Sequence, residues 1–295
     1  MPFLGELSAF LTACLWSCGA LAFASATKRA GSFQVNVTRL VLAAIYLVLL
    51  IALARLDVDL SGTQIFYLSI SGVVGLSLGD TFLFKAFQEI GARVTMLIMS
   101  LAPAIAALFA YFALSETLSV SGVLGIAITL SGVSLVVSDR GTVESRIAVT
   151  TMGVVYAALA AVGQGTGLVF AKMAFRESDV DGFVATAVRI MASLVLLLPF
   201  AVMTKRYKNP VRMFSQDRKA FLLTALGSVL GPFLGISFSL IAIKHTKVGV
   251  AATIMALVPI LMLPLVRIIY KEKLTWRAIL GAVTAVAGVA VLFLR

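Results

Sequence analysis

Asp80, in the sequence SLGDTFLF, is the only one of the 13 acidic residues that falls well inside a long apolar stretch. A carboxylate surrounded by apolar residues is costly, and at such a position it commonly binds a cation or carries a proton. We therefore treat Asp80 as a candidate partner for an ammonium group or a proton. The structural alternative is a carboxylate near the end of its stretch, paired with Lys85 or hydrogen-bonded to Thr81.

Indole, amide and thioether side chains also interrupt the apolar stretches. Trp16 and Gln164 occupy matching places in the first and sixth stretches, and such groups suit a cavity that holds an organic solute. A Trp at a membrane interface and a Gln between helices are the structural alternatives. Flexible methionines with neighbouring hydroxyl groups flank two prolines, where they either line an adaptable pocket or fill the core: Met99 and Ser100, and Met255 and Thr253.

The sequence offers no cluster of residues for catalysis or for a metal ion. Cys14 and Cys18 stand one helical turn apart, and two thiols with one distant histidine, His245, cannot form a zinc site. A membrane enzyme would need grouped His, Asp, Glu or Ser side chains at one membrane face. No G-x-x-x-x-G-K loop is present, so nucleotide hydrolysis is not expected either. We expect no enzymatic activity, no metal and no cofactor.

Membrane-spanning helices are the elements that must position these residues. The chain is 61% hydrophobic and 13% charged, against roughly 25% charged in an average soluble domain. Most of its charge-free runs reach the roughly 20 residues with which a helix crosses a hydrocarbon core, and two shorter runs extend if Arg39 and Arg189 lie near membrane ends. We predict an all-α integral membrane protein with ten transmembrane helices in the runs 7–27, 40–54, 60–79, 94–115, 117–138, 147–171, 190–204, 220–243, 248–266 and 278–294.

Two segments of the chain repeat one another at a constant offset of 156 residues. LAPAIAALFAYFALSETLS begins at residue 101 and LVPILMLPLVRIIYKEKLT at residue 257. The offset relates Pro103 to Pro259, Glu116 to Glu272, Gly125 to Gly281 and Gly132 to Gly288. We predict two five-helix repeats, residues 1–140 and 147–295. Because five is odd, the second repeat enters the membrane from the opposite side, and inverted repeats are the architecture of secondary transporters.

The matched residues have predicted structural tasks. Pro103 and Pro259 lie near the centres of their apolar runs and should kink both helices beside the predicted site. Glu116 and Glu272 fall in tight turns, where a carboxylate complements the positive end of the following helix. Arg39 also matches Arg189 at the start of the second run of each repeat. Snorkelling to headgroups or capping a neighbouring helix is our preferred interpretation for this pair, and attraction of an anionic substrate is the second.

At the repeated proline, glutamate and glycines the chain resembles the drug/metabolite transporter superfamily, in particular its ten-helix EamA-type members. The resemblance covers essentially the whole chain. It implies export or exchange of small metabolites, with amino acids the commonest expectation. It also implies a cavity lined by the first, third, fourth, sixth, eighth and ninth helices. The small multidrug-resistance branch has a carboxylate in its first helix, which this sequence lacks. Either Asp80 substitutes for it, or the protein works as a facilitator or exchanger.

The predicted function is therefore a secondary transporter for a small solute, working by alternating access. The alternatives are an exporter of drugs or hydrophobic compounds, a channel, and a membrane scaffold or receptor that transports nothing. Expected partners are the lipid bilayer, the solute, and a proton or a second solute in exchange. Nothing distinguishes a monomer from a homodimer.

Basic residues are distributed unevenly along the predicted connections. If both termini lay inside, the cytoplasmic connections would hold only a minority of them, namely Arg55, Lys172, Arg176, Lys244, Lys247 and Arg295. The positive-inside rule thus predicts a multi-pass protein of the inner or plasma membrane with both termini outside, whereas the family resemblance implies both inside. The net charge of +11 belongs to these loops, and without a polar domain it does not indicate nucleic acid binding.

Overall fold

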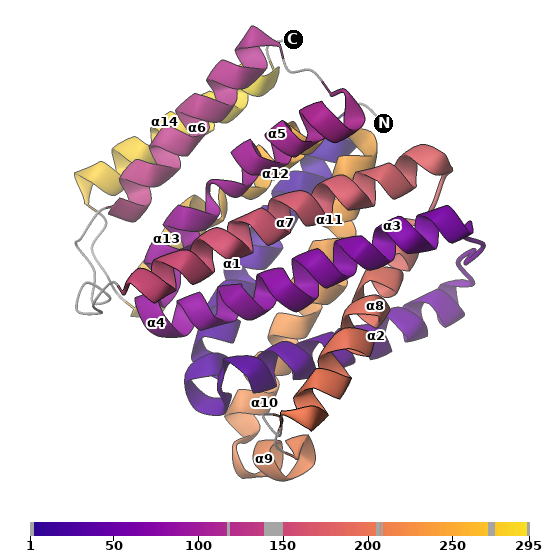
Figure 1. The fold of residues 1–295 in the computed structure, drawn as a ribbon. Helices are drawn as coiled ribbons and strands as arrows, with labels where there is room; N and C mark the ends of the chain where they lie inside the picture. The colour runs from indigo at the N-terminus through magenta and orange to yellow at the C-terminus, as the bar shows by residue number, and fades with distance from the viewer. Residues whose placement is uncertain are drawn as a thin grey trace.

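A computed structural model describes residues 3–116, 119–138, 150–204, 207, 209–270 and 275–293. Within these ranges the chain forms helices and contains no β-strand (Figure 1). In chain order the helices are α1 (Leu4–Ala30), α2 (Ser32–Ala54), α3 (Gly62–Gly72), η1 (Val73–Gly79), α4 (Asp80–Met99), α5 (Ala102–Leu114), α6 (Val120–Ser138), α7 (Thr151–Glu177), α8 (Gly182–Met203), α9 (Pro210–Gln216), α10 (Arg218–Ser228), η3 (Val229–Phe233), α11 (Leu234–His245), α12 (Val248–Met255), α13 (Val258–Tyr270) and α14 (Trp276–Phe293).

Seven helical segments of the described chain are long and apolar enough to cross a membrane. They are Leu4–Ala30, Ser32–Ala54, Gly62–Gly91, Thr151–Glu177, Gly182–Met203, Arg218–His245 and Val248–Leu265. Shorter apolar helices cover Ala102–Leu114, Val120–Leu135 and Ile279–Gly288, inside the fourth, fifth and tenth predicted runs. An all-helical, multi-pass membrane protein is thus confirmed, whereas the number of ten spans stays a prediction.

The two spans that contain the repeated prolines are interrupted at the predicted kinks. α4 ends at Met99 and α5 begins at Ala102, so Pro103 lies in the first turn of α5. In the same way, α12 ends before Pro259, which lies in the first turn of α13. A proline lacks the amide hydrogen that an interior turn needs, but a first turn does not use that hydrogen. Each proline therefore starts a second half-helix instead of only bending one.

Two other spans contain π-helical turns at matching places. The segment η1 joins α3 to α4, and η3 joins α10 to α11. The offset of 156 residues that relates the prolines also relates Val73, where η1 begins, to Val229, where η3 begins. Such turns are rare in proteins as a whole. Those that occur often lie at functional sites, because they widen the helix locally.

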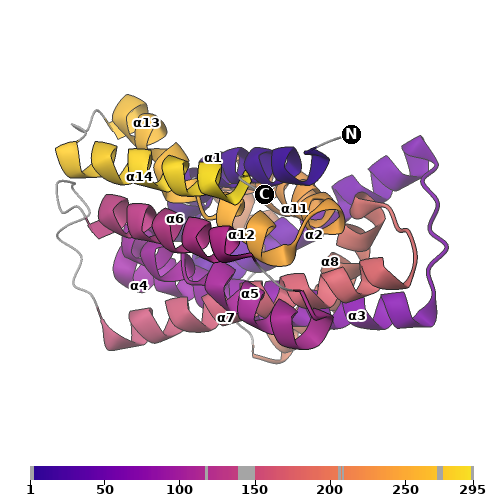
Figure 2. The ribbon, with the colours of Figure 1, turned by 90° about the horizontal axis from the view of Figure 1, so that it is seen from above.

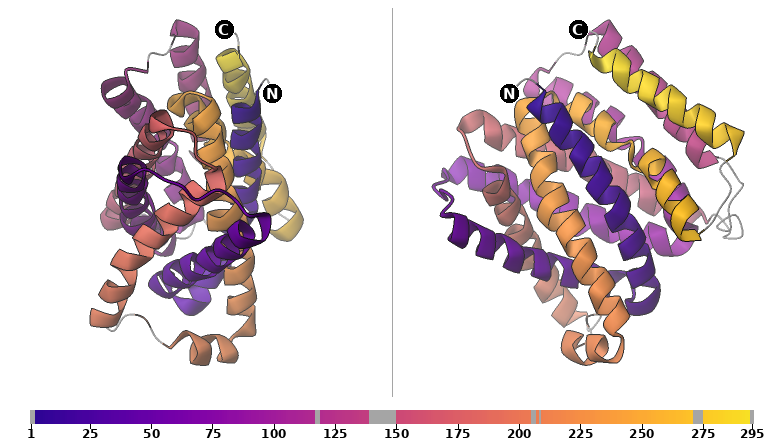
Figure 3. Two further views of the ribbon diagram at one scale, coloured as in Figure 1. Left: turned by 90° about the vertical axis from the view of Figure 1, so that its right-hand side faces the viewer. Right: turned by 180° about the vertical axis from the view of Figure 1, so that it is seen from behind.

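Each half of the chain packs its first helix against the other half. α1 contacts α10, α11 and α12, whereas α7 contacts α3, α4 and α5. Figure 1 shows α7 beside α3 and α4, and the right-hand view of Figure 3 shows α1 beside α10 and α11. Glycines permit this close approach, since a Cβ added to Gly163 of α7 would lie 2.8 Å from the Cα of Gly79. The seam between the two halves is therefore bounded by α1 and α7.

α6 and α14 lie side by side at one edge of the bundle (Figure 2). A Cβ added to Gly132 would overlap the backbone of Ala285 and lie 2.6 Å from the carbonyl oxygen of Gly281. A Cβ added to Gly288 would overlap the backbone of α6 and lie 2.9 Å from the carbonyl oxygen of Gly125. The repeated glycines thus let these two helices cross in backbone contact, which is the packing role expected of small residues in membrane helices.

Candidate functional site

A cavity lies at the seam, beside the breaks in both proline-containing spans. Its volume open to water is about 150 Å³, comparable to an engineered cavity that holds one benzene molecule in another protein. Residues of α1, η1, α4, α5, α7, η3, α11, α12 and α13 line it, together with one arginine each from α2 and α8. The cavity therefore draws on the predicted first, third, fourth, sixth, eighth and ninth helices, and also on the arginines that directly precede the second and seventh runs.

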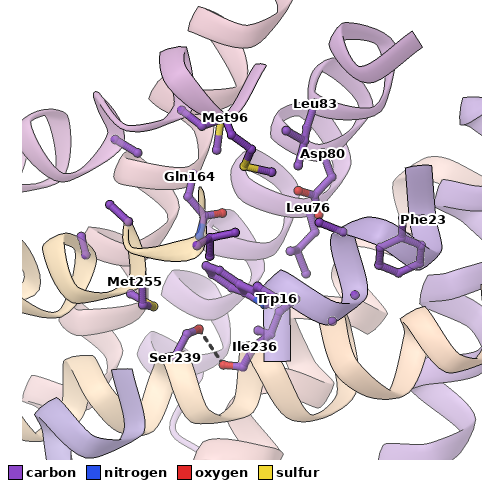
Figure 4. A pocket seen from close by; sticks show the side chains of 18 of the residues that line it. Trp16, Phe23, Leu76, Asp80, Leu83, Met96, Gln164, Ile236, Ser239 and Met255 are labelled. Atoms are coloured by element: carbon purple, nitrogen blue, oxygen red, sulfur yellow. Dashed lines mark hydrogen bonds between the residues drawn. The ribbon is translucent and has the colours of Figure 1, made fainter. Parts of the chain in front are cut away.

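Trp16 and Gln164 reach the cavity from α1 and α7. Figure 4 shows the Gln164 amide beside the indole of Trp16, with Asp80 on the neighbouring helix α4. Both side chains are half-buried, and neither donates a hydrogen bond to the described part of the chain. The Nε1 atom of Trp16 lies against Gly235 of α11, where an added Cβ would overlap it, so the Gln164 amide is the polar group of this pair that is available to a solute. An amide within a largely apolar lining suits an amphipathic molecule.

The residues that flank the prolines divide into two groups. Met99, Ser100 and Met255 line the cavity, as do Pro103 and Pro259. Thr253, in contrast, is fully buried in α12 and donates a hydrogen bond of 2.7 Å to the carbonyl oxygen one turn earlier. Its predicted place at the cavity is corrected for a geometric reason: two residues along a helix correspond to a rotation of roughly 200°. Because Met255 faces the cavity, Thr253 faces the core.

Asp80 lies at the cavity but already has a partner there. Its Oδ2 atom accepts a hydrogen bond from Nη2 of Arg39, and the two side chains are only 12% and 6% exposed. The partners expected for Asp80 are engaged elsewhere. The hydroxyl of Thr81 accepts a hydrogen bond from an amide of α2, and the ammonium of Lys85 lies 5.0 Å from the ring centre of Tyr156. The structural alternative of pairing with Lys85 or Thr81 is replaced by an ion pair with Arg39, because α2 brings a cation closer.

Arg39 and Arg189 are buried inside the bundle and line the cavity, which does not fit snorkelling to headgroups; a role in capping a neighbouring helix, the other part of the preferred interpretation, stays a prediction. α2 begins at Ser32 and α8 at Gly182, seven residues before each arginine. The helices extend beyond the charge-free runs because their polar residues face protein. In α2 these buried residues are Gln34, Asn36, Thr38 and Arg39.

Glu116 complements the start of a helix, but not of the helix that was predicted. Its Oε2 atom accepts a hydrogen bond of 3.0 Å from the backbone N–H of Val248, the first residue of α12. Its Oε1 atom lies 3.9 Å from Nη2 of Arg176, in the last turn of α7. The expected partner was α6, which follows Glu116 in the chain. Glu116 thus joins the two halves, and its counterpart Glu272 lies outside the described residues.

Sequence reasoning missed the groups that surround Arg39. Its guanidinium carbon lies 5.4 Å and 4.7 Å from the ring centres of Phe23 and Phe84, and its Nε and Nη2 atoms donate to Asn36 at 3.0 Å and 2.9 Å. Asn36 carries a detectable signal, because residues three apart are neighbours on a helix. The phenylalanines carry none, since they come from α1 and α4.

Comparison with known proteins identifies the family. A solved structure titled only "Crystal structure of protein" has a TM-score of 0.78 and 20% sequence identity to this chain, and the similarity covers 98% of this chain and 96% of that one. This likeness establishes the fold alone. No curated protein matches the chain. The model of the EamA-like transporter family matches twice, at residues 3–138 and 151–294. These two matches span nearly the whole sequence, and the chain therefore belongs to the EamA-like transporter family.

Proposed function

We propose that this protein is a secondary transporter that exports or exchanges a small metabolite, an amino acid or a related amphipathic solute, by alternating access around the cavity. One observation carries the proposal. The cavity forms where one span of each half is broken, and both halves contribute to its lining. Discontinuous helices at a site between two inverted repeats allow one half to move against the other and expose the site to each side in turn. In this proposal the repeats are residues 1–140 and 147–295.

The lining also supports a second candidate. Besides its few polar groups the cavity is surrounded by apolar and aromatic side chains, among them Leu76, Phe84 and Phe87. An exporter of hydrophobic compounds or drugs, from the same superfamily, would use these groups and would not require Gln164.

In either case a monomer or a homodimer would drive transport of the solute with a proton gradient or by exchange against a second solute.

Counterflow in proteoliposomes tests the proposal. We expect that proteoliposomes containing the purified protein, when preloaded with an unlabelled amino acid, transiently accumulate the same amino acid in labelled form, and that the initial rate saturates with its concentration. A panel of amino acids and hydrophobic cations separates the two candidates. Flux without saturation or counterflow would indicate a channel. Binding without flux would indicate a scaffold or receptor, and either result would contradict the proposal.

Orientation is tested separately. The distribution of Lys and Arg favours both termini outside, which places residue 208 in the cytoplasm. A cysteine introduced at that position should then resist an impermeant thiol reagent in intact cells. Labelling in intact cells would instead support the orientation that the family resemblance implies, with both termini inside.

A further inference from the structure

The two matched arginines of the cavity differ in their surroundings. Arg39 has protein partners: it pairs with Asp80, donates two hydrogen bonds to Asn36 and lies against the rings of Phe23 and Phe84. An arginine buried in a membrane protein needs such partners, because an isolated charge at membrane depth is strongly unfavourable. Arg39 and Asp80 together carry no net charge.

Arg189 has no such partners. The residue is 2% exposed, and its Nε atom is buried without a hydrogen-bond partner. The guanidinium donates no hydrogen bond to the described residues and lies more than 4.0 Å from each of their carboxylate oxygens. It nevertheless lines the cavity, with Nη2 beside Gly75 of η1. A planar group with five N–H donors thus faces a cavity that holds a single carboxylate, which is already bound to Arg39.

The second half of the chain lacks the acceptors that serve Arg39 in the first half. The offset that relates Arg39 to Arg189 relates Asn36 to Thr186, whose hydroxyl donates to the carbonyl oxygen of Gly182 in its own helix. The offset of 156 residues relates Asp80 to Ile236, an apolar residue that also lines the cavity. Arg189 therefore lies at the cavity without a carboxylate in ion-pair contact among the described residues, although the repeated scaffold has positions for one.

The charges of the lining add up to an excess of one positive charge. Among the described residues that line the cavity, the acidic and basic side chains are those of Arg39, Asp80 and Arg189. Asp80 acts electrostatically on Arg189 as well, but its hydrogen-bonded partner is Arg39. A monoanion would neutralise the cavity, and a planar carboxylate would match the paired N–H groups of a guanidinium.

We propose that Arg189 binds the carboxylate of the transported solute, a small molecule with one carboxylate and an apolar body. This inference rests on the proposed function and specifies its substrate class. The cavity volume of about 150 Å³ has room for a body of the size of a branched aliphatic or small aromatic group. The carboxylate comes either from an amino acid or from a monocarboxylic acid without an amino group. Trp16 and Gln164 face the rest of the solute.

Three related probes separate the groups that are recognised. Leucine carries a carboxylate and an ammonium, 4-methylpentanoate only the carboxylate, and 3-methylbutylamine only the ammonium. We expect 4-methylpentanoate to raise the Tm of the purified protein in a concentration-dependent manner, because a ligand that binds the folded state stabilises it, and we expect no effect of the amine. An equal effect of leucine would identify amino acids as the source of the carboxylate, and a weaker one monocarboxylic acids; both support the proposal. Stabilisation by the amine alone, or by none of the three, overturns it.

Substitution of Arg189 provides the matched control. Arg189→Gln should weaken carboxylate binding by about tenfold or more, because it removes a charge-assisted pair of hydrogen bonds. Arg189→Lys, which keeps the charge but not the planar group, should weaken binding less. The Tm of the ligand-free Arg189→Gln protein should be unchanged or higher, since the substitution removes an unpaired buried charge. If Arg189 had only a structural role, the ligand-free Arg189→Gln protein would have a lower Tm, and Arg189→Lys would bind the carboxylate as the unmutated protein does. These two results would overturn the proposal.

Transport is measured on the same variants, so that the two proposals can fail separately. If Arg189→Gln exchanges a carboxylate with an unchanged KM, the carboxylate site is wrong and the transporter stands. If the unmutated protein binds 4-methylpentanoate through Arg189 but shows no counterflow of any solute, the site stands and the transport function is wrong.

Discussion

At the scale of single residues, Asp80 is best understood as the counter-ion of Arg39. The pair is buried, and the amide of Asn36 and two aromatic rings complete the surroundings of the guanidinium. An Asp that already accepts from an arginine is a poorer partner for a solute ammonium than a free carboxylate. That Asp80 meets a solute ammonium or carries a proton stays a prediction. An experiment must distinguish this role from pairing with Arg39.

A double-mutant cycle makes this separation. We expect Asp80→Asn to destabilise the protein by about 3 kcal/mol, because it leaves the buried Arg39 charge unpaired. Adding Arg39→Gln should restore much of this loss, which gives a large coupling energy between the two positions. Unfolding in detergent with increasing denaturant measures the four stabilities. If the stability losses of the two single variants simply added up in the double variant, Asp80 would not be the counter-ion of Arg39 and would be a free carboxylate.

The position of Asp80 at the site could be predicted from the sequence, but its partner could not. A lone carboxylate in an apolar run is a local signal that a single residue carries. The partner lies 41 residues away along the chain, and the predicted end of its helix placed Arg39 at the membrane surface. Charge-free runs underestimate helices whose polar residues face protein. This error affected α2 and α8 alike.

At the scale of elements, the crossing of α3 and α8 fixes the place of Arg189. A Cβ added to Gly72 would overlap the carbonyl oxygen of Arg189, and the hydroxyl of Ser193 donates to the carbonyl oxygen of Gly72 at 2.8 Å. The backbones of the two helices therefore touch at the residue whose side chain enters the cavity. Any change that separates them moves the guanidinium.

α3 contains two glycines, one at each end, that provide a test and its control. Gly72→Ala should lower the Tm and weaken solute binding, because the new methyl group overlaps backbone; overpacking of this kind costs about 1–3 kcal/mol. Gly62→Ala, at the other end of α3, should leave both unchanged or raise the Tm slightly, since nothing lies within 4 Å of its added Cβ. Thermal unfolding and ligand titration of both variants check this. Equal behaviour of the two would show that the helices are not in contact at Gly72.

Some features of the elements follow from local chemistry and others from packing. The breaks at Pro103 and Pro259 could be predicted, because a proline removes its own amide hydrogen wherever it stands. The π-helical turns η1 and η3 could not, since their sequences VVGLSLG and VLGPF share no such local rule. Likewise the turn residue Glu116 was recognised as a helix-capping carboxylate, but the helix that it caps is distant in sequence.

At the scale of the whole molecule, the exchange of α1 and α7 between the halves determines what can move. The N-terminal half of α1 packs against α11 and α12. Ala9, Thr12 and Ala13 of α1 and Val248 of α12 are all fully buried there. In the proposed mechanism one half moves against the other, and this contact joins α1 of the first half to two helices of the second. A covalent link across the contact should therefore hold the protein in a single state.

Gly5 and Thr246 are suitable positions for such a link. A Cβ added to Gly5 would lie 3.0 Å from the Cβ of Thr246 and 3.1 Å from the carbonyl oxygen of Ala242. A disulfide requires a Cβ–Cβ distance of roughly 3.5–4.5 Å, so the two segments must separate slightly for the link to form. In a protein whose Cys14 and Cys18 are replaced by serine, the double variant Gly5→Cys/Thr246→Cys should lose counterflow on oxidation and regain it on reduction. The two single variants should be insensitive to the oxidant. Full counterflow through the oxidised pair, with the disulfide verified by mass spectrometry, would mean that the contact between α1 and α11 stays closed throughout transport, and that the solute reaches the cavity by another route.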